Sequence, residues 1–174
     1  MRGGDLPTEA QFEYAAGGLA SRLYVWGSDP PSCVDAVWGR GGVGLLKTAP
    51  SQCRTDDIGG PVALPADPSK RTTDPRARDW IALPTGVVFD LAGNAVEWML
   101  DRFQRQDEPC WYDPATNVFH DPFCDSIGAF GEQRAARGGS WAEAAAALQA
   151  VNRQVGDPDV GGFNLGFRCA RPAL

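Results

Sequence analysis

The hydrophobic pattern is clearest between residues 86 and 98, where an apolar run rich in β-branched and aromatic side chains ends in a sharp break. Such a run is typical of a buried strand. The break is Gly93-Asn94, a pair that tolerates positive φ well, so the pattern predicts a tight turn there. Apolar residues resume at Trp98 and predict a strand or short helix over residues 98–103.

A capping box near the start of the chain predicts the first helix. Thr8 and Gln11 have the required spacing, and the helix is expected over residues 9–16, ending at a pair of glycines. Residues 28–79 and 104–133 show no comparable periodicity, so both are expected to be irregular loops.

The last third of the chain gives mixed signals. Trp141 follows two glycines, which favours a close backbone approach with the indole as a core anchor. The alanine-rich residues 142–148 favour a helix, and Ser140 with Glu143 forms a second capping box. Residues 163–171 alternate well enough to predict a terminal strand.

Two carboxylates flank the central turn. Asp90 precedes it and Glu97 follows it. A turn exposes carbonyl oxygens, and two carboxylates beside them give the hard, oxygen-only surroundings that calcium accepts. The alternative is that Asp90 stabilises the turn through its own backbone and that Glu97 faces water.

The composition describes a folded domain with many loops. The chain has 174 residues, which suits a single domain over residues 1–174 with a real core. Glycine (21) and proline (14) are abundant, and the charged fraction of 22% is ordinary. A net charge of −6 without a basic block argues against nucleic acid and anionic membranes as partners. The sequence shows no apolar run of bilayer-spanning length and no signal peptide.

The five cysteines include no C-x-x-C pair, and with a single histidine they do not predict a zinc site. Cys33 with Cys53, and Cys110 with Cys124, each bracket a loop. Two loop-closing disulfides would suit an exported, extracellular or periplasmic protein. The alternative is five reduced thiols in a cytosolic chain. Cys169 lies in an apolar run and is predicted to be buried and inert.

Five stretches carry a more specific signal because of their order. They are residues 6–16 (LPTEAQFEYAA), 24–27 (YVWG), 89–98 (FDLAGNAVEW), 137–141 (RGGSW) and 165–170 (LGFRCA). Together they resemble the formylglycine-generating enzyme, or sulfatase-modifying factor, family, over nearly the whole chain. Each motif alone would be weak.

The resemblance implies a C-type-lectin-like fold. This is a mostly irregular α+β domain with small twisted antiparallel sheets, few short helices and long loops. The resemblance also implies that the central turn binds structural calcium. The ligands would be the side chains of Asp90 and Glu97 and the main-chain carbonyls of Gly93 and Ala95.

The resemblance does not extend to the catalytic residues. Active members of the family oxidise a sulfatase cysteine with copper held by two cysteines just after the Gly-Gly-Ser-aromatic motif. Here those places fall near Glu143 and Leu148, in a segment without cysteine. Carboxylate and alkyl groups do not replace the thiolates that bind Cu(I), so neither copper nor a catalytic residue is expected. Cys110 and Cys124 lie in a different loop and are expected to bond to each other.

Three functions remain in competition. The favoured one is a non-catalytic, calcium-stabilised, lectin-like binding or scaffold domain of an exported bacterial protein, with a protein or small-molecule ligand that the sequence does not identify. One branch of the fold displays variable binding positions, which here would be residues 142–163. The second is a formylglycine-generating oxidase acting on a sulfatase cysteine.

The third is a truncated domain without independent function, because the family has further strands before the first helix. A missing N-terminal segment or a partner chain would then cover a sheet edge or apolar face near residues 6–14.

Overall fold

The computed structural model describes residues 4–41, 51–54, 60–61, 77–84, 86–115 and 119–171. Regular structure within these ranges is sparse. It consists of α1 (Glu9–Gly17), β1 (Ile81–Leu83), β2 (Gly86–Val88), β3 (Val96–Arg102), β4 (Arg134–Arg137), the 3₁₀ helix η3 (Ala145–Leu148), β5 (Gln154–Gly156) and β6 (Leu165–Gly166). The protein is therefore a mixed α+β domain with limited regular secondary structure, as the sequence predicts. No helix in the described ranges has the length and apolarity needed to cross a bilayer.

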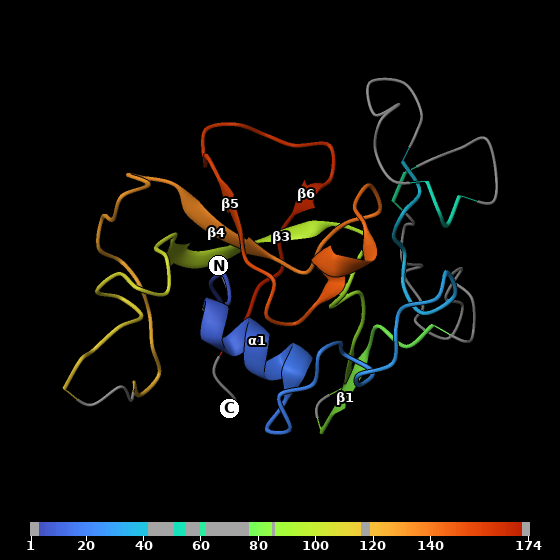
Figure 1. The fold of residues 1–174 in the computed structure, drawn as a ribbon, viewed down its shortest axis with the longest axis horizontal. Coiled ribbons are helices and arrows are strands. Elements are labelled where there is room, and N and C mark those ends of the chain that lie inside the picture. Colours follow the sequence, from blue (N-terminus) through green and yellow to red (C-terminus); the bar gives the residue numbers. More distant parts are fainter. Residues whose placement is uncertain are drawn as a thin grey trace.

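The centre of the molecule is a four-stranded sheet in the order β5-β4-β3-β6 (Figure 1). The β3–β4 and β4–β5 pairs are antiparallel, whereas β6 runs parallel to β3. The register between β3 and β4 shifts between Trp98 and Arg102, which marks a bulge. The pair β1–β2 forms a separate antiparallel sheet. Because β3 pairs on both sides, it fixes the turn that precedes it.

Helix α1 packs on one side of this sheet and closes the core (Figure 1). Its capping box is present, because Gln11 N donates to Thr8 Oγ1 at 3.2 Å and Thr8 N donates to Gln11 Oε1 at 3.0 Å. Phe12 belongs to the same buried cluster as Met99 of β3 and Ala135 of β4. The predicted first helix is thus confirmed to within one residue at its end.

The surface near residues 6–14 does not form a broad apolar face. Phe12 is 3% exposed and Leu6 is half-buried, so the one large apolar side chain there that is fully exposed is Tyr14, at 62%. The side of α1 that faces away from the core is otherwise polar or half-buried. The uncovered apolar face expected near residues 6–14 is therefore not seen among these described residues, where Tyr14 is the one exposed aromatic side chain.

Both predicted disulfides are present, Cys33–Cys53 and Cys110–Cys124. Each closes a loop within one of the two segments that the sequence predicts to be irregular. Residues 42–50, 55–59, 62–76 and 116–118 of these segments lie outside the described residues. Disulfides form and persist in oxidising compartments, so this pair indicates a non-cytoplasmic environment. The prediction for Cys169 is wrong, because the structure leaves this free cysteine exposed.

The predicted terminal strand is also much shorter than expected. β6 comprises only Leu165–Gly166, which pair with Val96 and Glu97. Beyond it the described residues form no further strand pairing with β3, the Phe167 side chain is 70% exposed, and an isolated bridge joins Asp5 to Ala170. The alternating pattern that predicted the strand therefore reflects a short parallel pairing followed by an irregular segment.

Candidate functional site

The predicted central turn is present and is held on both sides by main-chain contacts. Asp90, Gly93 and Asn94 all have positive φ, at 54°, 80° and 63°. Gly93 N donates to Gly138 O at 2.8 Å, and Asn94 N donates to Val37 O at 2.7 Å. A Cβ atom at position 93 would lie 2.4 Å from Val37 O, so both the backbone angle and the close approach require glycine there.

The two carboxylates of the turn are buried beside an arginine. Asp90 and Glu97 are each 8% exposed. Arg168 donates to both carboxylate oxygens of Glu97 through Nε and Nη2. The same guanidinium also donates to Phe89 O at 3.2 Å and to Asp90 O at 3.0 Å. The alternative in which Glu97 faces water is therefore wrong.

The carboxylates of Asp90 and Glu97 are close enough to influence each other electrostatically. Burial raises the pKa of Glu97, Arg168 opposes that rise, and the negative charge of Asp90 adds to it. Asn94 Nδ2 donates to Asp90 Oδ2 at 3.1 Å, which orients that carboxylate. The turn therefore holds two carboxylates and one guanidinium in largely buried surroundings.

The donor types at this turn suit a hard cation such as calcium. Asp90, Gly93, Ala95 and Glu97 all come from the one turn, and each offers oxygen. Within the described ranges, however, no three or more histidine, cysteine, aspartate or glutamate side chains gather in a geometry that could hold a metal. Any cation there would have to rely on main-chain oxygens and share Glu97 with Arg168.

The segment after Trp141 contains the places where the resemblance would put the copper ligands. Leu148 is 1% exposed and belongs to the main core. Glu143 is held by two neighbours, since Ser140 Oγ donates to its Oε2 at 2.8 Å and Gln154 Nε2 donates to its Oε1 at 2.8 Å. Asn164 Nδ2 donates to Ser140 Oγ at 3.0 Å. A hydrogen-bonded carboxylate and a core leucine do not provide the soft ligands that Cu(I) requires.

The helix predicted over residues 142–148 is mostly absent. Only Ala145–Leu148 is helical, as a 3₁₀ turn whose N-cap, Ala144, makes no side-chain cap. The Ser140 hydroxyl bonds to the Glu143 side chain instead of capping a helix. The backbone at Ala147 also passes close to Gly139, because a Cβ atom at position 139 would lie 2.7 Å from Ala147 O. This close approach determines the path of residues 142–148, although their composition favours a longer helix.

No cysteine lies where it could stand in for the missing ligands. Cys110 and Cys124 are bonded to each other, as are Cys33 and Cys53, and disulfide sulfurs are not thiolates. The remaining thiol is that of Cys169. One thiol does not make the pair that holds Cu(I).

Sequence reasoning missed the arginines that neutralise the buried acids. Arg168 pairs with Glu97, 71 positions away, and Arg153 pairs with Glu9, 144 positions away. The only available signal for Arg168 was its place in the motif at residues 165–170. Helix and strand periodicity carry no information about such distant partners.

Comparison with known proteins identifies the relatives of this chain. The family model described as "Sulfatase-modifying factor enzyme 1-like domain" matches residues 1–173. A formylglycine-generating enzyme of Streptomyces coelicolor is 32% identical over 172 residues, which cover 97% of this chain and 46% of the relative. An "Inactive C-alpha-formylglycine-generating enzyme 2" of Bos taurus is 26% identical over 178 residues, covering 99% of this chain and 45% of the relative.

A solved structure supports the fold. Treponema denticola variable protein 1 superposes with a TM-score of 0.61 at 23% identity, covering 97% of this chain and 48% of that one. The chain therefore spans about half the length of the curated relatives it matches.

Proposed function

This chain belongs to the sulfatase-modifying factor enzyme 1-like domain family, and we propose that it is a non-catalytic, calcium-stabilised, lectin-like binding or scaffold domain of an exported bacterial protein. Family membership alone does not decide between catalysis and binding, because one matched relative is named a formylglycine-generating enzyme and another is named inactive.

The observation that carries the non-catalytic proposal is the packing of residues 143–148. Leu148 fills the core at 1% exposure, and Glu143 is bonded to both Ser140 and Gln154. Restoring a copper site would require two substitutions, one of them inside the core. Glu143 has a structural role here, because its hydrogen bond from Gln154 joins the segment after Trp141 to β5.

Calcium is proposed at the central turn, held by the Asp90 and Glu97 carboxylates with the main-chain oxygens of Gly93 and Ala95. What supports it is a pair of buried carboxylates in one turn, where the negative charge of Asp90 acts on Glu97. A bound cation would offset the repulsion between Asp90 and Glu97 and hold the turn that meets Val37 and Gly138. Export is supported by the two disulfides.

The deciding experiment is copper-dependent turnover. The purified chain, loaded with Cu(I), is incubated with a cysteine-containing sulfatase peptide, and aldehyde formation is followed by mass spectrometry. We expect no aldehyde and no tight Cu(I) binding by competition with a chromogenic chelator. The matched positive variant is the double substitution Glu143→Cys and Leu148→Cys, which we expect to gain Cu(I) affinity. Turnover by the native chain would establish the oxidase alternative.

Thermal melting separates a folded domain from a fragment that needs a partner. We expect a cooperative transition that calcium shifts upward, because a ligand that binds only the native state stabilises it. A broad transition without a calcium response would favour the truncated-domain alternative.

A further inference from the structure

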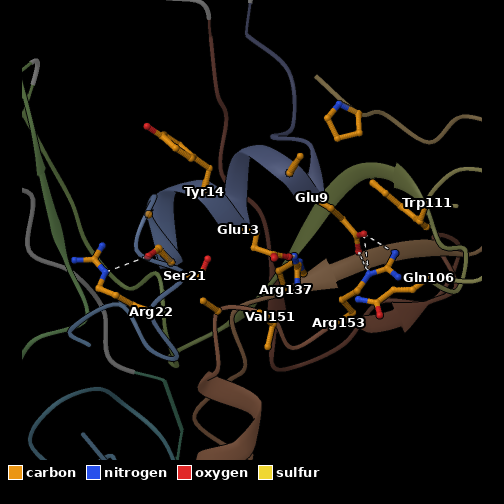
Figure 2. Close-up of a pocket in the computed structure, with 15 residues that line it drawn as sticks. Glu9, Glu13, Tyr14, Ser21, Arg22, Gln106, Trp111, Arg137, Val151 and Arg153 are labelled. Carbon is orange, nitrogen blue, oxygen red and sulfur yellow. Dashed lines mark hydrogen bonds and ion pairs between the residues drawn. The ribbon is translucent and has the colours of Figure 1, made fainter. Parts of the chain in front are cut away.

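A cleft of about 600 Å³ runs along the side of α1, away from both the central turn and residues 143–148. Its walls are α1, residues 150–153 and the loop that carries Trp111. Figure 2 shows Glu13 over Arg137 near the middle, with the Glu9–Arg153 pair on one side and Arg22 on the other. The lining therefore carries three arginines and two glutamates, an excess of one positive charge.

The two ion pairs in the cleft differ in exposure. In the Arg153–Glu9 pair both side chains are buried, at 12% and 3% exposure. Arg153 also stacks over the rings of Phe103 and Trp111, at 4.9 and 5.1 Å from their centroids. In the second pair Arg137 is 1% exposed, whereas Glu13 is 46% exposed. The first pair is thus fixed, but Glu13 is free to turn into water.

Arg137 has no such freedom. Its Nη1 donates to Asn152 O at 2.8 Å, and its Nη2 donates to Glu13. Among the described residues its Nε has no hydrogen-bond partner. An uncompensated buried charge is destabilising, so Glu13 leaves Arg137 at a free-energy cost, and an anion that takes its place removes that cost. The position is already shaped for a carboxylate, since Glu13 supplies one.

We infer that this cleft binds a small ligand carrying one carboxylate and an apolar or aromatic body, with its carboxylate replacing that of Glu13 on Arg137. The guanidinium favours a carboxylate because its planar donors match the two oxygens. The body would rest on Trp111, Val151, Pro122 and Ala10, which line the cleft around the pair. The volume lies within the range of small-molecule sites.

This site adds a ligand class to the binding module proposed above, but the two can fail separately. Turnover on a sulfatase peptide would overturn the non-catalytic proposal and leave the cleft unaffected. Failure of the binding test below would remove the cleft and leave the non-catalytic proposal unaffected.

The test is calorimetric titration of the whole chain with N-acetylphenylalanine, and with a tetrapeptide of three glycines followed by a C-terminal phenylalanine. Each acid is compared with its neutral C-terminal amide. The key variant is Glu13→Gln, which removes the competing carboxylate. Its matched control is Glu132→Gln, another exposed glutamate paired with an arginine (Arg102), which does not line the cleft.

We expect the acids to bind saturably and the amides not to bind. If Glu13 occupies Arg137 about nine-tenths of the time, Glu13→Gln should bind the acids roughly tenfold more tightly, because the competent fraction of the cleft rises. Glu132→Gln should keep the native affinity. A preference for the tetrapeptide would identify a chain terminus as the ligand, and a preference for the smaller acid would identify a free organic acid; both support the site.

The inference is overturned if acids and amides bind alike, if Glu13→Gln gains no affinity, or if neither acid binds any variant at about 10 mM. If Glu13→Gln fails to fold, a titration of the native chain still tests the site. The indole N–H signal of Trp111, assigned with Trp111→Phe, should shift on titration with the acid and not with the amide. A signal that moves with neither probe, or equally with both, overturns the site.

Discussion

The turn around Asp90 and the segment around Glu143 lie against each other, because Trp141 N donates to Asn94 O at 3.1 Å. Both contain buried or half-buried carboxylates, but these carboxylates have different kinds of hydrogen-bond partner. Glu97 faces a guanidinium and shares its surroundings with a second carboxylate. The Glu143 side chain accepts from a hydroxyl and an amide. The turn therefore places two carboxylates near one another, whereas the neighbouring segment holds its one carboxylate with neutral hydrogen-bond donors.

The largest effect should come from breaking the charged pair of the turn. Glu97→Ala leaves Arg168 in place without its carboxylate, and losing one partner of such a pair costs about 3–5 kcal/mol. Urea unfolding in EDTA measures this cost without any contribution from calcium. Glu132→Ala is the control, because that glutamate is 67% exposed and its pair with Arg102 should contribute under about 1 kcal/mol. Equal losses in both variants would show that the turn is no more charge-dependent than the surface.

The neighbouring segment should respond to volume instead of charge. Leu148→Ala removes a side chain that is 1% exposed, and we expect a loss of about 2–5 kcal/mol from lost burial and the cavity left behind. Leu148→Met keeps the volume and should cost less than about 1.5 kcal/mol. Urea unfolding at fixed pH measures both. A loss in Leu148→Met as large as that in Leu148→Ala would mean that side-chain volume alone is not what residue 148 supplies.

Calcium should distinguish the two regions directly. At a calcium concentration 100 times Kd, the native chain should gain about 2.7 kcal/mol. Asp90→Ala should abolish most of this gain, whereas Asp90→Asn keeps a side-chain oxygen and should retain part of it. Thermal melting with calcium and with EDTA gives the response. A full response in Asp90→Ala would reject the proposed ligands.

The elements that sequence predicted best are those whose signals are local. The capping box of Thr8 and Gln11, the glycine turn at Gly93 and the loop-closing cysteines each involve residues near one another in the chain. Their physics is decided by short-range geometry, so pattern and structure agree. The α+β class followed from the ordered motifs, because composition alone permits many loop-rich folds.

The features that the sequence predicted wrongly or not at all depend on contacts between residues far apart in the chain. Residues 142–148 have helical propensity, but the close crossing of Gly139 over Ala147 and the burial of Leu148 impose a different path. Tertiary packing outweighs propensities of a few tenths of a kcal/mol per residue. The pairing of Arg137 with Glu13 spans 124 positions and leaves no periodic trace in the sequence.

A smaller effect is expected at Glu143. Glu143→Ala removes the carboxylate that accepts from Ser140 and Gln154, and because this side chain is only half-buried we expect a loss of about 1–2 kcal/mol in total. Glu143→Gln keeps a carbonyl acceptor and should recover part of the loss. Neither variant should change the melting response to calcium. If Glu143→Ala weakens that response as much as Asp90→Ala does, the two regions act as one site and the contrast between them is wrong.

The smallest effect tests the segment that joins the two regions, residues 35–38, and it depends on pH. Burial alone would raise the pKa of Asp35, but hydrogen bonds from Arg78 and Ser32 outweigh it and lower the pKa below its usual range. A lowered folded-state pKa gives stability that is present above the unfolded pKa of about 4 and is lost as pH falls through the folded value.

Asp35→Asn should therefore be less stable than the native chain at pH 7. Because Arg78 is 40% exposed and screened by solvent, the difference should be about 1 kcal/mol or less. It should shrink as the pH falls below about 4, since the native carboxyl becomes protonated as the pH passes through its lowered pKa and loses its attraction for Arg78. Urea unfolding of both chains across this range measures the difference. A gap that stays constant would mean that Asp35 supports Val37, and with it the turn, through its shape and neutral hydrogen bonds and not through its charge.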